Sequence, residues 1–359
     1  MRRGDTGAAV AEVRARLIHL GLSTHGDHAD VFDEQLDQAV RTFQQDRGIT
    51  VDGIVGAQTF RRLEEARWQL GDRVLSYVPG HLRTGDDVTE LQRRLTQLGF
   101  ATGRQDGMFG PQTDVALREF QAGVGVTADG TCGPDTFRAF DRLVRTVSGG
   151  SASELREHVT LIGLQTGVAD KVVVIDPGAT AGADLCHAIA VRVEGRLAAL
   201  GTQVLLTRSA RGGSGLPDDL AHAQFANETG ADLVLSLNVD SVTSPLPNGL
   251  ATFYYGDPRG GVHSPAGRIL AGLVQDEVRA RTDLLDCRTH PRSWDLLRLT
   301  RMPAVRVELG YLSNDADSRR LASPAFQDTV AEGLAAAVTT FCAPRQELTG
   351  GRRPGSGTT

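Results

Sequence analysis

Three apolar runs in the second half of the chain end beside residues whose side chains are able to take part in chemistry. The runs are Val172–Asp176, Leu233–Val239 and Ala304–Glu308. Such runs are typical of strands buried on both faces of a parallel sheet, and the carboxyl ends of parallel strands meet at one edge. We therefore expect a functional site near Ala179, Asn238 and Glu308.

Two common hydrolytic arrangements are not indicated by the sequence. A Gly-x-Ser-x-Gly elbow, which would position a nucleophilic serine, does not occur. No cysteine has a histidine at the spacing of a catalytic partner, and no Cys-x-x-Cys pair suggests a zinc finger. The cysteines are widely spaced, which is typical of reduced and mostly buried thiols: Cys132, Cys186, Cys287 and Cys342.

The elements that would position the site alternate between strand and helix from Lys171 onward. Further strands are predicted at Gln203–Arg208 and Leu250–Tyr255, and helices at Asp184–Leu200, Asp218–Thr229, Pro265–Arg281 and Asp328–Phe341. Alternation of this kind predicts an α/β domain over residues 171–342, with a mostly parallel sheet and helices on both faces.

The N-terminal part of the chain contains two copies of one unit, at residues 4–66 and 85–143. Three motifs of the first copy recur in order in the second: Phe43-Gln44 as Phe120-Gln121, Asp52-Gly53-x-x-Gly56 as Asp129-Gly130-x-x-Gly133, and Thr59-Phe60 as Thr136-Phe137. Agreement over this many positions indicates a duplication.

Each copy is predicted to form three helices. In the second copy we expect Asp86-Asp87 to cap a helix that Gly99 ends, with further helices at Thr113–Phe120 and Pro134–Leu143. Asp-Gly pairs at 106–107 and 129–130 supply the turns between them. The sequence thus predicts two small all-α modules, over residues 1–70 and 80–147, and a linker at 148–170.

Composition narrows the classes of protein. The 359 residues are too many for one hydrophobic core, and a net charge of -6 argues against a nucleic-acid partner. No apolar run is long enough for a membrane helix. Charged residues near the N-terminus interrupt any apolar core of a standard export signal, so we expect the protein to stay in the cytoplasm.

The second copy of the repeat, from GDDVTELQRRLTQLGF through DGMFGPQT to ADGTCGPDTF, resembles the peptidoglycan-binding module found beside many cell-wall hydrolases. The first copy departs from that pattern, because Ala29-Asp30 stands where the second has Asp106-Gly107 and Asp33 replaces Gly110. The resemblance implies binding of a muropeptide or glycan in a groove between helices. A scaffold for protein contacts is the alternative.

Residues 171–342 resemble the zinc-dependent N-acetylmuramoyl-L-alanine amidases. The resemblance rests on VVVIDPG, RVEGRLAALGTQVLLTRS, ADLVLSLN and above all PAVRVELGYLSN, which runs from Pro303 to Asn314. Those enzymes cleave the amide that joins muramic acid to the first alanine of the stem peptide. Two histidines and a glutamate bind their zinc, and a glutamate on the last strand, matched here by Glu308, is the general base.

The resemblance fails at the zinc ligands. Ala179 stands where the first histidine is expected, Gly182 lies where the glutamate is expected, and Asn238 replaces the second histidine. Alanine and glycine offer no lone pair, and an asparagine amide is a poor zinc ligand. Because water without zinc keeps a pKa of about 15.7, Glu308 has no adequate nucleophile to activate. We therefore predict that zinc is absent and that Glu308 is a vestigial, structural carboxylate.

A rebuilt zinc site is the alternative, with Cys186, His187 and Asp240 as ligands. Neighbours on a helix point about 100° apart, so Cys186 and His187 are not expected to face one ion together. The other histidines of this domain, His222, His263 and His290, are expected in or beside helices or loops at the surface.

A closer resemblance, carried by DCRTHPRSWDLLRLTRMP from Asp286 to Pro303, is to a cytoplasmic regulatory branch of this family. It implies a pseudoenzyme that a serine/threonine kinase phosphorylates on a C-terminal threonine. The phosphorylated form would bind and activate the enolpyruvyl transferase MurA, which catalyses the first committed step of peptidoglycan precursor synthesis, and the lipid II flippase is a further implied partner. An active amidase and a non-catalytic muropeptide-binding protein are the alternatives.

The tail at residues 343–359 is rich in Gly, Pro and Arg and is expected to be disordered. Thr349 is the expected phosphate acceptor, with Ser356, Thr358 and Thr359 as rivals. A phosphate there would add a charge of about -1.5 to -2 next to arginines of the tail.

Overall fold

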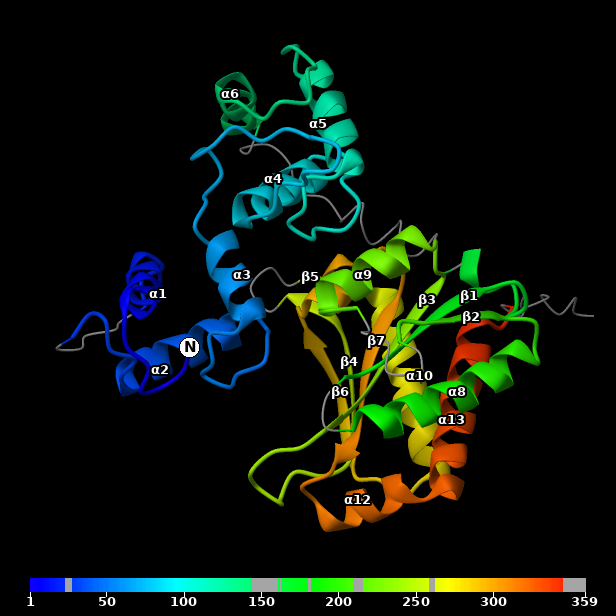
Figure 1. The fold of residues 1–359 in the computed structure, drawn as a ribbon. Coiled ribbons are helices and arrows are strands. Elements are labelled where there is room, and N and C mark those ends of the chain that lie inside the picture. The colour runs from blue at the N-terminus through cyan, green and yellow to red at the C-terminus, as the bar shows by residue number, and fades with distance from the viewer. Residues whose placement is uncertain are drawn as a thin grey trace, which may run out of the picture.

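The structure is a computed structural model that describes residues 1–22, 28–143, 161, 163–179, 182–208, 216–257 and 262–344. Thr349, nearly all of the predicted tail and most of the predicted linker lie outside these residues. Two small helical units stand beside a larger domain in which helices flank a sheet (Figure 1).

Each repeat folds into three helices, as predicted. The first contains α1 (Ala8–His19), α2 (Glu34–Asp46) and α3 (Ala57–Glu65), and the second contains α4 (Asp86–Gln97), α5 (Pro111–Gly123) and α6 (Pro134–Leu143). Each module has an apolar core of its own, and in the second Phe120 stacks on Phe140 with 4.2 Å between ring centroids.

The start of α4 differs from the prediction. Asp86 and Asp87 lie in the first turn of the helix, and Gly85 is the N-cap, without a side-chain capping bond. Asp87 instead accepts two hydrogen bonds from Arg73, and Asp86 forms an ion pair with Arg47 of the first module. The cap prediction was wrong because both carboxylates have arginine partners outside the helix, which bind them more strongly than a backbone N–H would.

A buried glutamine ties each Asp-Gly turn of the second module to the helix before it. The side-chain amide of Gln92 donates to the Asp106 carboxylate and to the Thr113 hydroxyl. Gln121 makes the equivalent bonds around the next turn, and Gln44 does so in the first module. These bonds explain why Gln, Asp-Gly and Thr recur at fixed spacing.

The remaining turn of the first module is held by an ion pair instead. Arg14 takes the place of Gln92, and it donates to the Ala29 carbonyl and to Asp33, with 2.9 Å between nitrogen and carboxylate oxygen. Arg14 is only 4% exposed. The departures of the first copy, Ala29 and Asp33, are therefore a matched replacement that keeps this turn bonded.

Replacing Arg14 with alanine should destabilise the first module by about 2–3 kcal/mol, because the carbonyls of Ala29 and Val31 lose a buried donor and Asp33 loses its cation. Chemical denaturation followed by circular dichroism measures this change. Arg3→Ala is the control, since Arg3 and its partner Glu34 are 63% and 78% exposed and such pairs contribute about 0–1 kcal/mol. Equal effects of the two substitutions would contradict the role given to Arg14.

The sheet has the strand order β2-β1-β3-β7-β4-β5, and β6 pairs with β4. The parallel strands are β1 (Val172–Pro177), β2 (Gln203–Leu206), β3 (Leu233–Asp240) and β7 (Ala304–Tyr311). The fourth predicted strand in chain order, β4 (Leu250–Asp257), runs antiparallel to β7. This arrangement confirms the predicted, mostly parallel sheet.

Two strands were not predicted, β5 (Val262–His263) and β6 (Asp286–Arg292). His263 and His290 therefore lie in strands, which corrects their expected place in helices or loops. Strand β5 is only two residues long, and β6 is half-exposed, so neither shows the apolar run that marks a buried strand.

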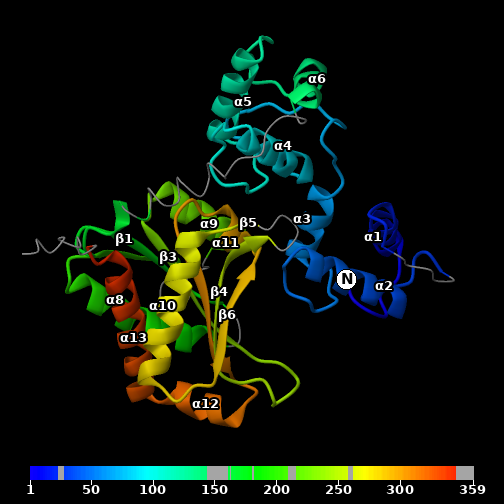
Figure 2. The same ribbon diagram turned by 180° about the vertical axis from the view of Figure 1, so that it is seen from behind.

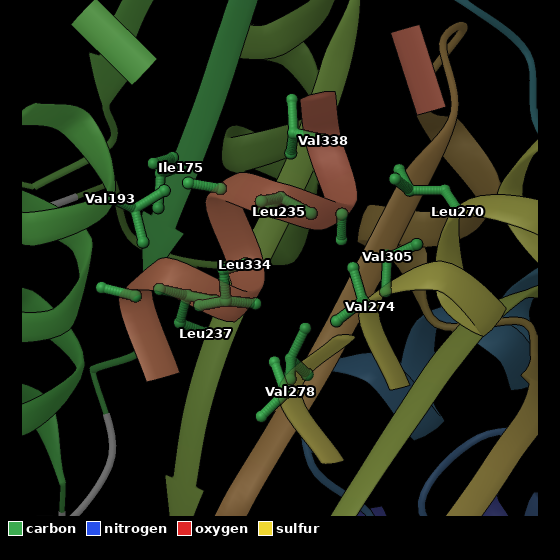
Figure 3. Close-up of a cluster of buried hydrophobic side chains, with 14 of the residues drawn as sticks. Ile175, Val193, Leu235, Leu237, Leu270, Val274, Val278, Val305, Leu334 and Val338 are labelled. Carbon is green, nitrogen blue, oxygen red and sulfur yellow. The ribbon is translucent and has the colours of Figure 1, made fainter. Parts of the chain in front are cut away.

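Helices cover both faces of the sheet. One face packs against α8 (Ala183–Ala198), α10 (Pro265–Arg281) and α13 (Pro324–Cys342), and Figure 2 shows the last two side by side. Ile175, Leu235 and Val305 point into this core, together with Val274 and Leu334 from the helices (Figure 3). The other face carries α9 (Asp219–Glu228) and α11 (Asp295–Leu299), while α12 (Asp315–Ala322) follows β7.

Because side chains alternate along a strand, the residues next to those core positions face α9 and α11. They include Asp176 of β1, Ser236 and Asn238 of β3, and Arg306 and Glu308 of β7. Among the described residues, none of the helices has the length and apolar character needed to cross a bilayer.

Candidate functional site

The strands that carry the predicted site residues lie next to one another. Asn238 of β3 is in register with Glu308 of β7, and β1 borders β3 on its other side. Asn238 and Glu308 are both buried, whereas Ala179 is exposed in the loop after β1. The structure therefore brings Asn238 and Glu308 together and places Ala179 at the rim of the same sheet edge.

The loop between β1 and α8 packs closely against β3. A Cβ atom on Gly182 would overlap the side chain of Val239, and one on Gly178 would overlap the amide of Asn238. Arg208 also holds this loop, because its guanidinium donates to the carbonyl of Ala183. A longer side chain at residue 182 would have to displace either Val239 or the loop.

A layer of buried polar groups lies beneath this edge. The Asp176 carboxylate accepts hydrogen bonds from the hydroxyls of Thr207, at 2.6 Å, and Ser236, at 2.7 Å, and Asn238 donates to Ser236. Burial would raise the pKa of Asp176, but the contact with His222 and the two hydroxyls together hold it below the ordinary value. Asp176 is therefore an ionised carboxylate inside the protein.

His222 of α9 supplies the cation for Asp176. Its Nδ1 lies 3.2 Å from the carboxylate and its Nε2 lies 3.2 Å from the carbonyl of Leu216. Both ring nitrogens face acceptors, which suits the doubly protonated ring. Burial would lower the pKa of His222, yet the charges of Asp176 and Asp219 outweigh burial and raise it above its ordinary value of 6.5. His222 was predicted to be a surface histidine, and the structure places it in this buried pair.

The pair predicts a pH dependence of stability. The folded-state pKa of His222 is raised. The pair's contribution to the free energy of unfolding is therefore complete below the ordinary pKa of 6.5, and it is lost as the pH rises through the folded-state pKa. We expect the wild type to lose stability relative to His222→Gln as the pH rises above 6.5 and through the folded-state pKa of the ring. Unfolding free energies measured at several pH values test this, and parallel curves for the two proteins would contradict it.

Glu308 already has a cation beside it. Its Oε1 accepts a hydrogen bond of 2.8 Å from Nε of Arg306, two residues earlier on β7, and the Arg306 guanidinium stacks on the ring of Trp294. Its Oε2 is buried and has no hydrogen-bond partner among the described residues. The carboxylate therefore lies in a protein-made ion pair.

The described residues do not bring three or more His, Cys, Asp or Glu side chains together in a group suited to a metal. For the alternative ligand set, burial and the charge of Glu308 raise the pKa of Cys186 to about 12, so the thiol stays protonated at neutral pH. Zinc would have to displace this proton in order to bind the sulfur. Asp240 is exposed at the end of β3. The residues found here do not fit the zinc that the family resemblance implies.

The segment around α11 joins the helical modules to the sheet domain. Arg298, 6% exposed, forms ion pairs with Glu65 of the first module, at 2.9 Å, and with Asp295 of its own helix, at 3.2 Å. It also donates to the carbonyl of Asp106 in the second module. Burial would lower the pKa of Arg298, but these carboxylates raise it, so the guanidinium stays charged.

Further contacts to the same segment come from both modules. Arg61 forms an ion pair with Asp295, Arg62 donates to the carbonyl of Ser293, and Arg104 donates to the carbonyl of Leu297. Ile49 of the first module is buried with Trp294 and other apolar residues of this face. The sequence marked Asp286–Pro303 only by its resemblance to a regulatory branch of the family. It did not indicate that this segment holds the helical modules against the sheet domain.

Replacing Arg298 with methionine should cost about 1.5–3 kcal/mol, because Glu65 and Asp295 lose the cation they share and keep only Arg62 and Arg61 as partners. We expect the modules to separate from the sheet domain before either unfolds, which limited proteolysis and small-angle scattering would detect. Arg279→Met is the matched control, because Arg279 is 54% exposed and lies 3.8 Å from its partner Asp286. Unchanged scattering and protease resistance for the Arg298 variant would contradict the docking role.

Comparison with known proteins agrees with this architecture. The family profile of N-acetylmuramoyl-L-alanine amidases matches residues 173–340, and that of the peptidoglycan binding domain matches residues 6–63 and 84–140. The N-acetylmuramoyl-L-alanine amidase CwlM of Mycobacterium tuberculosis is 45% identical, over 94% of this chain and 88% of its own length. The chain belongs to the N-acetylmuramoyl-L-alanine amidase family.

Other members match a smaller part of the chain. The amidase CwlL of Bacillus licheniformis is 31% identical over 40% of this chain and 46% of its own length. Among solved structures, the amidase Ami1 of Mycobacterium smegmatis matches with 21% identity and a TM-score of 0.44, covering 49% of this chain and 99% of that one. The similarity to CwlM differs from both because it includes the two helical modules as well as the amidase-like domain.

Proposed function

We propose that the chain is a non-catalytic member of the amidase family that regulates peptidoglycan precursor synthesis in the cytoplasm. One observation carries the first half of this proposal. At the edge where β1, β3 and β7 end, Ala179, Gly182 and Asn238 offer no metal donor of the kind that zinc requires, and Glu308 is ion-paired with Arg306.

The chemistry of amide hydrolysis supports the same conclusion. Zinc lowers the pKa of a bound water from about 15.7 to about 7, which makes removal of its proton by a carboxylate far easier. Here the cation next to Glu308 is the guanidinium of Arg306. A guanidinium has no empty orbital that accepts a lone pair of water, so it does not act on water as a metal ion does. The contact between Gly182 and Val239 further means that a glutamate ligand does not fit the present loop.

The regulatory half of the proposal is supported by resemblance. The segment Asp286–Pro303, on which the regulatory resemblance rests, is also the segment that docks both modules. A chain whose modules are held against the sheet domain presents one composite surface to a partner. The partner we propose is the enolpyruvyl transferase of precursor synthesis, with phosphorylation of Thr349 by a serine/threonine kinase as the signal and the lipid II flippase as a further contact.

Metal content and hydrolysis test the first half. Purified protein incubated with zinc and then dialysed should retain far less than one zinc per chain, and it should release no stem peptide from peptidoglycan fragments. An active family amidase treated in the same way is the positive control. If the chain retains stoichiometric zinc and cleaves the fragments, and Glu308→Gln abolishes the cleavage, the chain is an amidase, as the name of its mycobacterial relative states.

Transferase kinetics test the second half. Phosphorylated protein should raise the turnover of the enolpyruvyl transferase, and unphosphorylated protein or a Thr349→Ala variant should not. Activation by all three forms would contradict the phosphorylation signal. If none activates the enzyme but the protein binds muropeptides in calorimetry, a non-catalytic muropeptide-binding protein is the better description.

A further inference from the structure

A cavity of about 480 Å³ lies between the second module and the sheet domain. One wall is formed by the loop before α5 and the first turn of that helix. The opposite wall is formed by the end of α9, the start of α10 and the residues after α11. Cavities that bind small ligands commonly measure about 300–1,000 Å³. Because the two walls come from different domains, the cavity exists only while the module is docked.

The charges that line this cavity favour an anion. Arg301 and Arg104 contribute two guanidinium groups, of which that of Arg104 already donates to the carbonyls of Leu297 and Thr300, and Asp106 is the single acid in the lining. Asp106 is already engaged, since its carboxylate accepts hydrogen bonds from Gln92 and from the backbone N–H of Met108. The Arg301 side chain, in contrast, is exposed, and no hydrogen bond or ion pair is found for its guanidinium among the described residues.

The two modules differ at the point where the cavity meets α5. In the first module the N-terminus of α2 is closed by its own side chain, because Asp33 accepts a hydrogen bond from the N–H of Leu36. In the second module the corresponding residue is Gly110, which lines the cavity and leaves α5 without a side-chain cap. The second module therefore lacks, at the mouth of this cavity, the acid that the first module has at the equivalent position.

The rest of the lining is apolar, with Leu82, Met108, Leu299 and Pro303 among its residues. Guanidinium groups match the planar, bidentate geometry of carboxylates and phosphates. We propose that this interdomain cavity binds a small amphipathic anion, with the anionic group, a carboxylate or a phosphate, beside Arg301 and the first turn of α5. This inference is independent of the proposed function, because Ala179, Gly182, Asn238 and Glu308 are not among the residues that line the cavity.

The probe for this site is 8-anilinonaphthalene-1-sulfonate, an amphipathic anion whose fluorescence rises in apolar surroundings. We expect saturable binding of one dye per chain. Gly110→Asp should weaken binding by about tenfold or more, because it adds a negative charge beside the anion. Aspartate is a preferred N-cap residue, so the melting temperature should not fall. Gly110→Ala is the matched control: a Cβ there meets nothing within 4 Å, and dye affinity should stay within about twofold.

Arg301 gives a second matched pair, because it is exposed and its substitution should not affect folding. Arg301→Glu should weaken dye binding as Gly110→Asp does, whereas Arg301→Lys should retain it. Displacement of the dye by inorganic pyrophosphate would identify a phosphate site, and displacement by N-acetyl-L-alanine would identify a carboxylate site. The proposal is overturned if Gly110→Asp and Arg301→Glu bind the dye as the wild type does, or if neither anion displaces it.

Discussion

The guanidinium of Arg298 is bonded to all three folded parts of the chain at once. It meets Glu65 of the first module, the carbonyl of Asp106 in the second, and Asp295 of the sheet domain. A buried charge is tolerated only when it is paired and hydrogen-bonded, and Arg62 and Arg61 are second cations for Glu65 and Asp295. The arrangement of the domains, and the cavity between them, depend on this interaction together with the contacts of Arg61, Arg62 and Arg104 to the same segment.

Buried charges are also paired at the edge of the sheet. Asp176 is balanced by His222, and Glu308 by Arg306, so both buried carboxylates have a cation supplied by the protein. The strands at this edge therefore have their buried charges balanced by other side chains of the protein.

Much of the fold could be predicted because local patterns specified it. The apolar runs of β1, β3 and β7 have few alternatives to burial in a sheet, and the repeated Gln, Asp-Gly and Thr residues form bonds within one module. The predictions failed where distant partners decided the outcome. Asp86 and Asp87 bind arginines rather than capping α4, and the half-exposed β6 is a strand only because β4 lies beside it.

The sequence by itself therefore determined the two helical modules, the parallel sheet, and the identity of the residues at its edge. It could not determine which groups those residues meet. His222 next to Asp176, and Arg298 between Glu65 and Asp295, were decided by the tertiary structure. The physical reason is that helices and strands arise from patterns over a few residues, whereas the pairing of buried charges depends on which distant segments the packed cores bring together.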